Sequence, residues 1–270
     1  MNLSRMSQVL EAFKLDKISV PDFKEENYFV FGECEKYEID VALDLETKME
    51  AYQLMYRLYR SPEMDYAKED SSKMWYSIFN ADPNTKTLVV KDSQSKKVVA
   101  TLTIVLDTVM GLPLEENYPN QIFNLRKNNR ICAEIISLGI DKDARGANEI
   151  LIQLFKFAYL IYRGIYFVTD FLIMIKPKHA LFYERKLVFK SIGEEVNCKK
   201  INNKPVMLYH LDLEKAQEKT QMNLCDNKQN NPNNCEEIFK SFVKAQNNKE
   251  LIGLLKEKVL HAEMSCHDLE

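Results

Sequence analysis

The chain has 270 residues, 46% of them hydrophobic, and a formal net charge of −3. This length and hydrophobic content allow one or two domains with a sizeable core, and the slightly acidic balance argues against a bulk nucleic-acid-binding protein. The six cysteines form no CxxC or CxxH pair, which argues against zinc and a disulfide framework and fits a reducing cytoplasm. The sequence contains neither the apolar core of a signal peptide nor the roughly 18 apolar residues of a membrane span. We therefore expect a cytoplasmic protein without an integral membrane segment.

Residues 1–40 are predicted to form an N-terminal extension of the main domain. Helical apolar spacing over residues 3–15 indicates a helix, and residues 28–31 favour a short strand. Residues 37–43 alternate apolar and polar side chains, which predicts a strand leading into the main domain.

A strong helical pattern begins at Asp44 and continues to about Tyr59, where Ser61-Pro62 ends it. Beyond it, apolar runs and alternation predict a mixed order of strands and helices. The predicted strands cover residues 87–91, 98–106, 131–140, 168–175, 188–196 and 205–212. The predicted helices cover residues 120–129, 148–162 and 178–185.

This order predicts a mixed α/β domain over residues 41–213, with a partly parallel sheet because helices connect some neighbouring strands. After Leu213 the composition changes. Residues 214–235 are rich in Lys, Gln and Asn and are interpreted as a polar linker. Helical apolar spacing then predicts a C-terminal helical segment over residues 236–270, interrupted near Asn247-Asn248.

The strand over residues 131–140 turns through Arg145-Gly146 directly into an apolar helix. A helix N-terminus offers free backbone N–H groups to a polar or anionic ligand. We therefore interpret this turn as a candidate donor-binding site, although a simple turn with a helix cap explains the same pattern.

Glu134 stands in the apolar run ICAEIISLGI. Burial of an unpaired carboxylate is costly and raises its pKa, so this side chain needs a partner or a chemical role. Either it lies at a strand edge, where it faces solvent or pairs with an arginine, or it acts as a general base toward an amine, directly or through a water molecule.

Tyr183 follows Phe182 on an apolar helix face. Two such aromatic side chains are more often core than catalytic, but the tyrosine hydroxyl is a candidate acid for a departing thiol. Two local basic clusters lie near these elements: Arg126, Lys127 and Arg130 form the first, and Lys176, Lys178, Arg185 and Lys186 form the second. Each cluster is either a solvated face or a docking surface for an acidic partner.

Several stretches together resemble the N-acyl amino acid synthases, a branch of the GCN5-related N-acetyltransferase (GNAT) superfamily related to the autoinducer synthases. The stretch TLTIVLDTVMGLP is followed in order by EIISLGID and HALFY, and the match spans roughly residues 41–213. The resemblance implies a twisted mixed sheet with helices on both faces. It also implies transfer of a long-chain acyl group from a thioester to the amine of an amino acid.

Residue by residue, the resemblance implies a catalytic role for Glu134 and for Tyr183, the latter as the acid that protonates the departing thiol. Donor binding is expected at the end of the strand and in the following turn, that is, at Leu138, Ile140, Arg145, Gly146 and Ala147. Because the turn has only one glycine, an acyl carrier protein is favoured as donor over coenzyme A. The basic residues Arg126, Lys127, Arg130, Lys176 and Lys178 are the candidate docking residues for that carrier.

Neither a metal nor a resident cofactor is expected, since the acyl thioester is a co-substrate. The expected partners are the carrier protein and a small amine or amino acid, with no nucleic acid. Peripheral contact with a membrane is left open. Two alternatives remain: an acetyl-CoA-dependent N-acetyltransferase, and a non-catalytic module that binds an acyl group or a protein.

Overall fold

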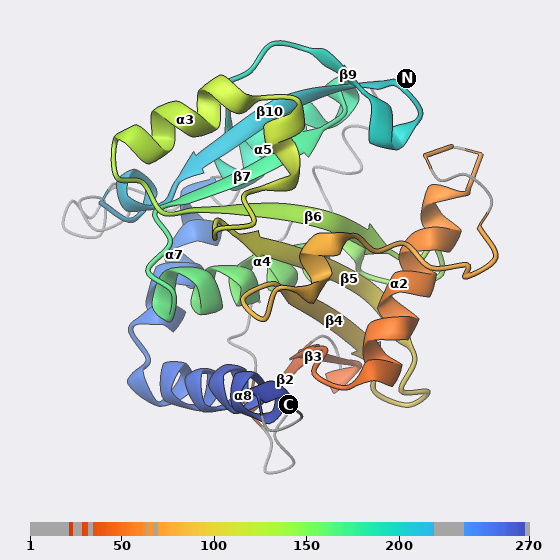
Figure 1. Ribbon diagram of the computed structural model, residues 1–270. Helices are drawn as coiled ribbons and strands as arrows, with labels where there is room; N and C mark the ends of the chain where they lie inside the picture. Colours follow the sequence, from red (N-terminus) through yellow and green to blue (C-terminus); the bar gives the residue numbers. More distant parts are fainter. Residues whose placement is uncertain are drawn as a thin grey trace, which may run out of the picture.

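One twisted sheet crosses the molecule, with helices on both of its faces (Figure 1). The computed structural model describes residues 22–23, 29–31, 35–62, 64–66, 70–218 and 235–267. The strands are β1 (Asp22–Phe23), β2 (Phe29–Phe31), β3 (Tyr37–Val41), β4 (Lys86–Asp92), β5 (Val98–Leu106), β6 (Cys132–Ile140), β7 (Asp170–Ile175), β8 (Lys190–Ser191), β9 (Val196–Cys198) and β10 (Lys204–Asp212). The α-helices are α2 (Leu45–Tyr59), α3 (Pro119–Lys127), α4 (Ala147–Gly164), α5 (Ala180–Leu187), α7 (Cys235–Gln246) and α8 (Lys249–His267). Short 3-10 helices connect them: η3 (Ile78–Ala81), η4 (Pro113–Glu116), η5 (Pro177–His179) and η6 (Lys199–Ile201).

The sheet order is β1-β2-β3-β4-β5-β6-β7-β10-β8, and β9 pairs with β10. Among the described strands, β6 and β7 form a parallel pair and the other pairs are antiparallel. The parallel pair arises because α4 connects the end of β6 to the start of β7, which requires a crossover. The mixed α/β sheet predicted from the sequence is therefore confirmed.

The helices α2 and α4 contact opposite faces of the central strands. The α4 face carries the large core, because nearly every side chain of this helix from Ile150 to Tyr162 is buried. The helices α7 and α8 pack beside α4 and join that core through Ile238, Phe242 and Leu255, among others. The predicted C-terminal helical segment is thus part of the same core, and its predicted interruption lies between α7 and α8.

The predicted extension supplies strands to the sheet. Strands β1 and β2 pair with each other, and β2 pairs with β3. Phe29 of β2 is fully buried and stacks edge-on against Phe157 of α4, with ring centroids 5.1 Å apart. The predicted helix over residues 3–15 lies outside the described residues.

One prediction of secondary structure was wrong. The single strand expected over residues 188–196 is two short strands, β8 and β9, because the chain between them bends around the Tyr118 ring. A Cβ atom on Gly193 would lie 2.5 Å from that ring, and the Tyr118 hydroxyl donates to the Glu194 carbonyl at 2.8 Å. Residues 213–218, where the predicted polar linker begins, are helical. Residues 219–234 lie outside the described part of the chain.

Within the described residues, no helix combines the length and the apolar composition that a membrane crossing requires.

Candidate functional site

The site lies where β6 and β7 separate. The two strands are paired from Cys132 to Ile135 of β6, opposite Asp170 to Ile173 of β7, and not beyond. β6 also has a β-bulge at this point: the two residues between Ile136 and Gly139 lie opposite the single residue between Thr101 and Thr103 of β5. One of the two, Ser137, has φ 49°. Bulges bend a strand and disturb its pairing, so this bulge helps β6 diverge from β7.

A cavity of about 490 Å³ lies at the separation of the two strands. Apolar residues of both strands form its walls, including Ile135 and Leu138 of β6 and Ile173 and Ile175 of β7. Its volume is within the range of small-molecule sites, and an apolar lining of this kind suits a hydrocarbon ligand.

Glu134 lines this cavity and is only 1% exposed. Its Oε2 atom accepts a hydrogen bond from the Leu114 backbone N–H at 2.8 Å, whereas its Oε1 atom is buried without a partner among the described residues. Burial raises the pKa of Glu134 to about 8, although the Leu114 N–H and the positive charge of Lys200 lower it in part. A carboxyl group with this pKa can gain or lose a proton near neutral pH, which is what a general base requires.

The raised pKa makes Glu134 a source of pH-dependent stability. Between about pH 4.5 and pH 8 the unfolded chain has lost this proton and the folded chain retains it, so stability should fall as pH rises. We expect a slope of at most about 1.4 kcal/mol per pH unit from this group. Glu134→Gln should remove that slope and gain stability over the parent protein at pH 8. Urea unfolding of both proteins at pH 5.5 and pH 8 measures the free energy of unfolding at each pH. If it changes by the same amount in the parent and in the variant, the raised pKa of Glu134 is contradicted.

Tyr183 of α5 also lines the cavity, with 9% of its surface exposed. Its ring contacts Phe155, Phe182 and Phe189 edge-on, with centroid distances of 6.2, 5.5 and 5.9 Å. Burial raises the pKa of its phenol well above the ordinary value, so the hydroxyl keeps its proton at neutral pH. Tyr183 is therefore both a core residue and a proton-bearing group at the cavity, and its role as a catalytic acid stays a prediction.

The last residue of α2 and the segment after it line the cavity with aromatic side chains that the sequence analysis did not assign to the site. Tyr59, Tyr66, Trp75, Tyr76 and Phe79 all line it. The Tyr59 ring packs against the rings of Tyr66 and Trp75, with centroids 5.1 and 4.9 Å apart. The sequence feature that could have indicated these residues is the density of aromatic side chains in a segment without strong helical or strand periodicity.

The expected donor-binding residues divide into two groups. Leu138 lines the cavity, whereas Ile140, Arg145, Gly146 and Ala147 do not. The three turn residues are exposed at the start of α4, and the Arg145 carbonyl accepts a hydrogen bond from the Tyr37 hydroxyl at 2.7 Å. Gly146 has φ 73°, a left-handed conformation that favours glycine. The next positions along α4, Asn148 and Leu151, do reach the cavity, so the turn lies beside it.

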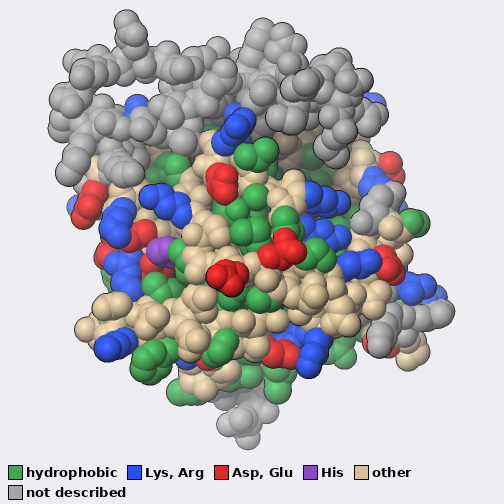
Figure 2. Space-filling view, turned by 90° about the horizontal axis from the view of Figure 1, so that it is seen from above, with side chains coloured by type: hydrophobic (Ala, Val, Ile, Leu, Met, Phe, Trp, Pro, Cys, Tyr) green, Lys and Arg blue, Asp and Glu red, His purple; other side chains and the backbone are tan. Residues whose placement is uncertain are grey.

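The candidate docking residues lie in two groups separated by the length of β7. Arg130 contacts Asp170 at the start of that strand, and Lys176 follows its end. At about 3.3 Å per residue the two places are roughly 17 Å apart. Arg126 pairs with Asp107 and Glu115. Figure 2 shows basic and acidic side chains interspersed on the face seen from above.

The pairing of the arginines changes how they are interpreted. Both arginines are held by carboxylates of the same chain, and Arg130 in particular contacts three of them, Asp170, Asp212 and Glu214. They do not form one continuous basic surface with Lys176 and Lys178. Lys127 is exposed on α3. A docking role for any of the five residues stays a prediction.

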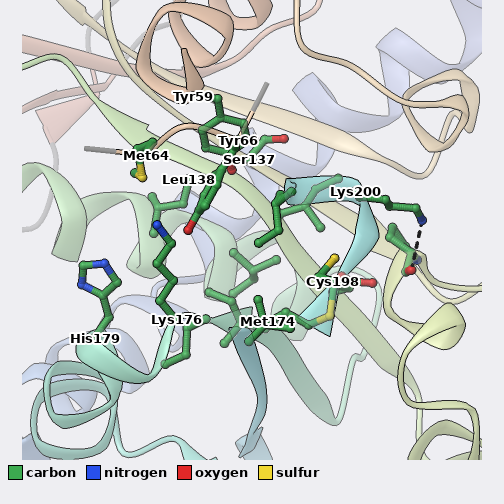
Figure 3. Close-up of a pocket in the computed structure, with 18 of the residues that line it drawn as sticks. Tyr59, Met64, Tyr66, Ser137, Leu138, Met174, Lys176, His179, Cys198 and Lys200 are labelled. Carbon is green, nitrogen blue, oxygen red and sulfur yellow. Dashed lines mark hydrogen bonds between the residues drawn. The ribbon is translucent and has the colours of Figure 1, made fainter. Parts of the chain in front are cut away.

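Three basic side chains line the cavity itself. Lys200 lies on one side of it, and Lys176 and His179 lie on the other (Figure 3). The Lys176 ammonium is 4.1 Å from the centre of the Tyr66 ring, a cation–π contact. Lys200 contacts Glu116 at 2.9 Å and the Pro113 carbonyl at 3.4 Å. Sequence reasoning missed Lys200, which carries no motif and comes into the site only through tertiary structure.

The family model of the N-acyl amino acid synthase FeeM matches residues 50–212, which include both separated strands, Glu134 and Tyr183. The chain belongs to this family. It is accordingly an acyltransferase of the GNAT superfamily, and the interpretation as a non-catalytic module is set aside. No curated protein matches the chain.

The solved structure of FeeM, an N-acyl amino acid synthase from uncultured soil microbes, agrees with this assignment at the level of the fold. It is 20% identical with a TM-score of 0.59, over 68% of this chain and 93% of that chain. Two further structures are less similar. The ribosomal-protein-S5-alanine acetyltransferase from Vibrio fischeri is 12% identical with a TM-score of 0.48, over 68% of this chain and 96% of that chain. The AHL synthase LasI is 13% identical with a TM-score of 0.47, over 65% of this chain and 89% of that chain.

Proposed function

We propose that the protein transfers a long-chain fatty acyl group from an acyl thioester, carried by an acyl carrier protein, to the amine of an amino acid. The observation that carries this proposal is the apolar cavity that reaches the buried Glu134 carboxyl group. Membership of a family named after an N-acyl amino acid synthase supports the same reaction. We place the reaction in the cytoplasm, consistent with the free thiols of Cys132 and Cys198.

The chemical step uses two titratable groups of the cavity, Glu134 and Tyr183. Glu134 takes a proton from the acceptor amine, directly or through a water molecule, and the amine nitrogen attacks the thioester carbonyl carbon. A C–N bond forms, the C–S bond breaks, and the thiolate takes a proton from Tyr183, which solvent later restores. Because the pKa of Tyr183 is raised by burial, this transfer is uphill and can only assist as the thiolate forms.

The apolar lining predicts a preference for long acyl chains. Each buried methylene group contributes about 0.8 kcal/mol, so kcat/KM should rise about fourfold per added methylene until the cavity is filled. The rise should be seen with a series of donors from acetyl to long-chain acyl, each on carrier protein and on coenzyme A at matched concentrations. Leu138→Trp should lower kcat/KM for long chains at least about tenfold by filling the cavity and should spare the acetyl donor.

Leu181→Trp is the matched control, because Leu181 is exposed on α5 and does not line the cavity. A higher kcat/KM for the acetyl donor than for every longer one would replace the proposal by a short-chain acetyltransferase. Equal rates with carrier-bound and coenzyme A donors would remove the carrier from the proposal. A clear preference for the carrier-bound donor would support docking at Lys176 and Lys178 beside the cavity.

Tyr183→Phe should lower the single-turnover rate about 10- to 100-fold while leaving the fold intact, since only the proton-bearing oxygen is removed. Tyr183→Ala should in addition lower the melting temperature through the cavity it leaves among the surrounding aromatic rings. Tyr209→Phe is the control: that hydroxyl contacts Glu184 and lies outside the cavity. A Tyr183→Phe variant with the parent's single-turnover rate would show that Tyr183 only packs.

A further inference from the structure

The peptide group between Pro113 and Leu114 contacts two charged side chains that line the cavity. Its carbonyl accepts from Lys200 Nζ at 3.4 Å, and its N–H donates to Glu134 Oε2 at 2.8 Å. The O and N atoms of one peptide group are about 2.3 Å apart, so Lys200 Nζ and Glu134 Oε2 are no more than about 8.5 Å apart. A single backbone link in η4 therefore holds an ammonium group and a carboxyl group within about 8.5 Å of each other.

This separation suits a ligand that carries an amine and a carboxylate on one carbon atom. In an α-amino acid the nitrogen and a carboxylate oxygen are about 3 Å apart. With a hydrogen bond of about 2.8 Å at each end, such a molecule spans roughly 8 to 9 Å. An α-amino acid can therefore reach from Lys200 to Glu134.

Both protein groups have capacity for such a ligand. Glu134 Oε1 is buried without a partner among the described residues. The contact of Lys200 with Glu116 joins two side chains that are 48% and 53% exposed. An exposed ion pair of this kind contributes little, so the carboxylate of a ligand can replace Glu116 as the partner of Lys200. Lys176, the other lysine of the cavity, is already engaged with the Tyr66 ring.

We propose that Lys200 binds the carboxylate of the acceptor amino acid and thereby places its amine against Glu134. This assignment rests on the proposed function and adds to it a residue that determines acceptor specificity. An amine without a carboxylate loses the Lys200 contact, whereas the acyl donor is unaffected. Lys200 should thus control the KM for the acceptor and not the binding of the thioester.

The test compares Lys200→Met with the parent protein on two acceptors: the standard amino acid that the parent acylates best, and the α-carboxamide of the same amino acid. A hydrogen bond to a charged group contributes enough that the variant should raise the KM for the amino acid about 10- to 100-fold. The KM for the amide should change less than about threefold, and the KM for the acyl donor should not change. The parent's preference for the free carboxylate should therefore disappear in the variant.

Two variants separate this role from a structural one. Lys199→Met removes the neighbouring lysine, which is exposed and does not line the cavity. Glu116→Gln removes the exposed partner of Lys200 and leaves Lys200 in place. Both should keep the parent's preference. If Glu116→Gln raises the acceptor KM as much as Lys200→Met does, the lysine only secures η4 and the assignment is overturned.

Failure of this assignment and failure of the proposed function give different results. A parent protein that acylates an amino acid, together with a Lys200→Met variant that keeps the full preference for the carboxylate, overturns the role of Lys200 alone. A parent protein that acylates no amino acid from any long-chain thioester overturns the proposed function and this assignment with it.

Discussion

Replacing Glu134 with Gln should lower the rate of acyl transfer about 100- to 10,000-fold, the usual cost of losing a general base. Gln has nearly the same shape and can still accept the hydrogen bond that the Leu114 N–H makes to Glu134. The expected loss is therefore chemical, because an ammonium group cannot attack a thioester and the Gln amide does not act as a base. Single-turnover rates with a verified acceptor measure it.

The pH dependence gives the same prediction a second, independent signature. Burial raises the pKa of Glu134 to about 8, so the reactive carboxylate accumulates as pH rises toward 8. The ratio of parent to variant rates should rise with pH up to about 8 and then level off, whereas the acceptor's own titration affects both proteins equally. Glu194→Gln, at an exposed position, is the control. A Glu134→Gln variant within threefold of the parent across this range would show that Glu134 is not the base.

Replacing Arg130 with Met should destabilise the protein by about 3 to 5 kcal/mol, because it leaves the buried carboxylate of Asp170 without its arginine partner. Asp170 is 0% exposed, and Arg130 Nε contacts its Oδ2 atom at 2.6 Å. Burial alone would raise the pKa of Asp170, but hydrogen bonds from His210, Arg130 and Thr169 keep it below its ordinary value. Arg130 therefore holds the start of β7 and the end of β10 together.

The measurement is the melting temperature, which should fall by about 10 °C at roughly 2 to 4 °C per kcal/mol for a domain of this size. Lys127→Met is the matched control, since Lys127 is exposed on the neighbouring helix. Asp170→Asn added to Arg130→Met should recover part of the loss, because the buried charge is then gone. An Arg130→Met protein with unchanged stability would contradict this prediction, and a slower reaction with carrier-bound donor would support Arg130 as a docking residue.

Much of the fold could be predicted from the sequence because apolar side chains recur with a regular period along its helices and strands. The apolar face of α4 and the apolar run of β6 can be buried in few ways, and each predicts its element within two residues of the observed bounds. The strand expected over residues 188–196 failed for a reason outside that segment. Tyr118, which is distant in the sequence, occupies the space that a continuous strand would need.

For the site, the sequence by itself determined that Glu134 is a carboxylate in an apolar strand and that Tyr183 is an aromatic residue on an apolar helix face. The charge partners were undetermined, because ion pairs form between residues that are distant in the chain. Only the tertiary structure joined Arg130 to Asp170 and Glu214, so this expected docking residue is also the ion-pair partner of a buried carboxylate.

The cavity and its charged groups were likewise decided by tertiary structure. Local patterns predicted β6 and β7 but not that their pairing ends after Ile135 and Ile173. That separation leaves room between two strands, and the aromatic segment after α2 lines it. The Pro113–Leu114 peptide group then brings Lys200 within reach of Glu134, although the two residues are far apart in the sequence. The periodicity of apolar residues indicates which face of a helix or strand is buried. A site depends instead on which residues, distant in the sequence, line the same cavity once these elements have packed.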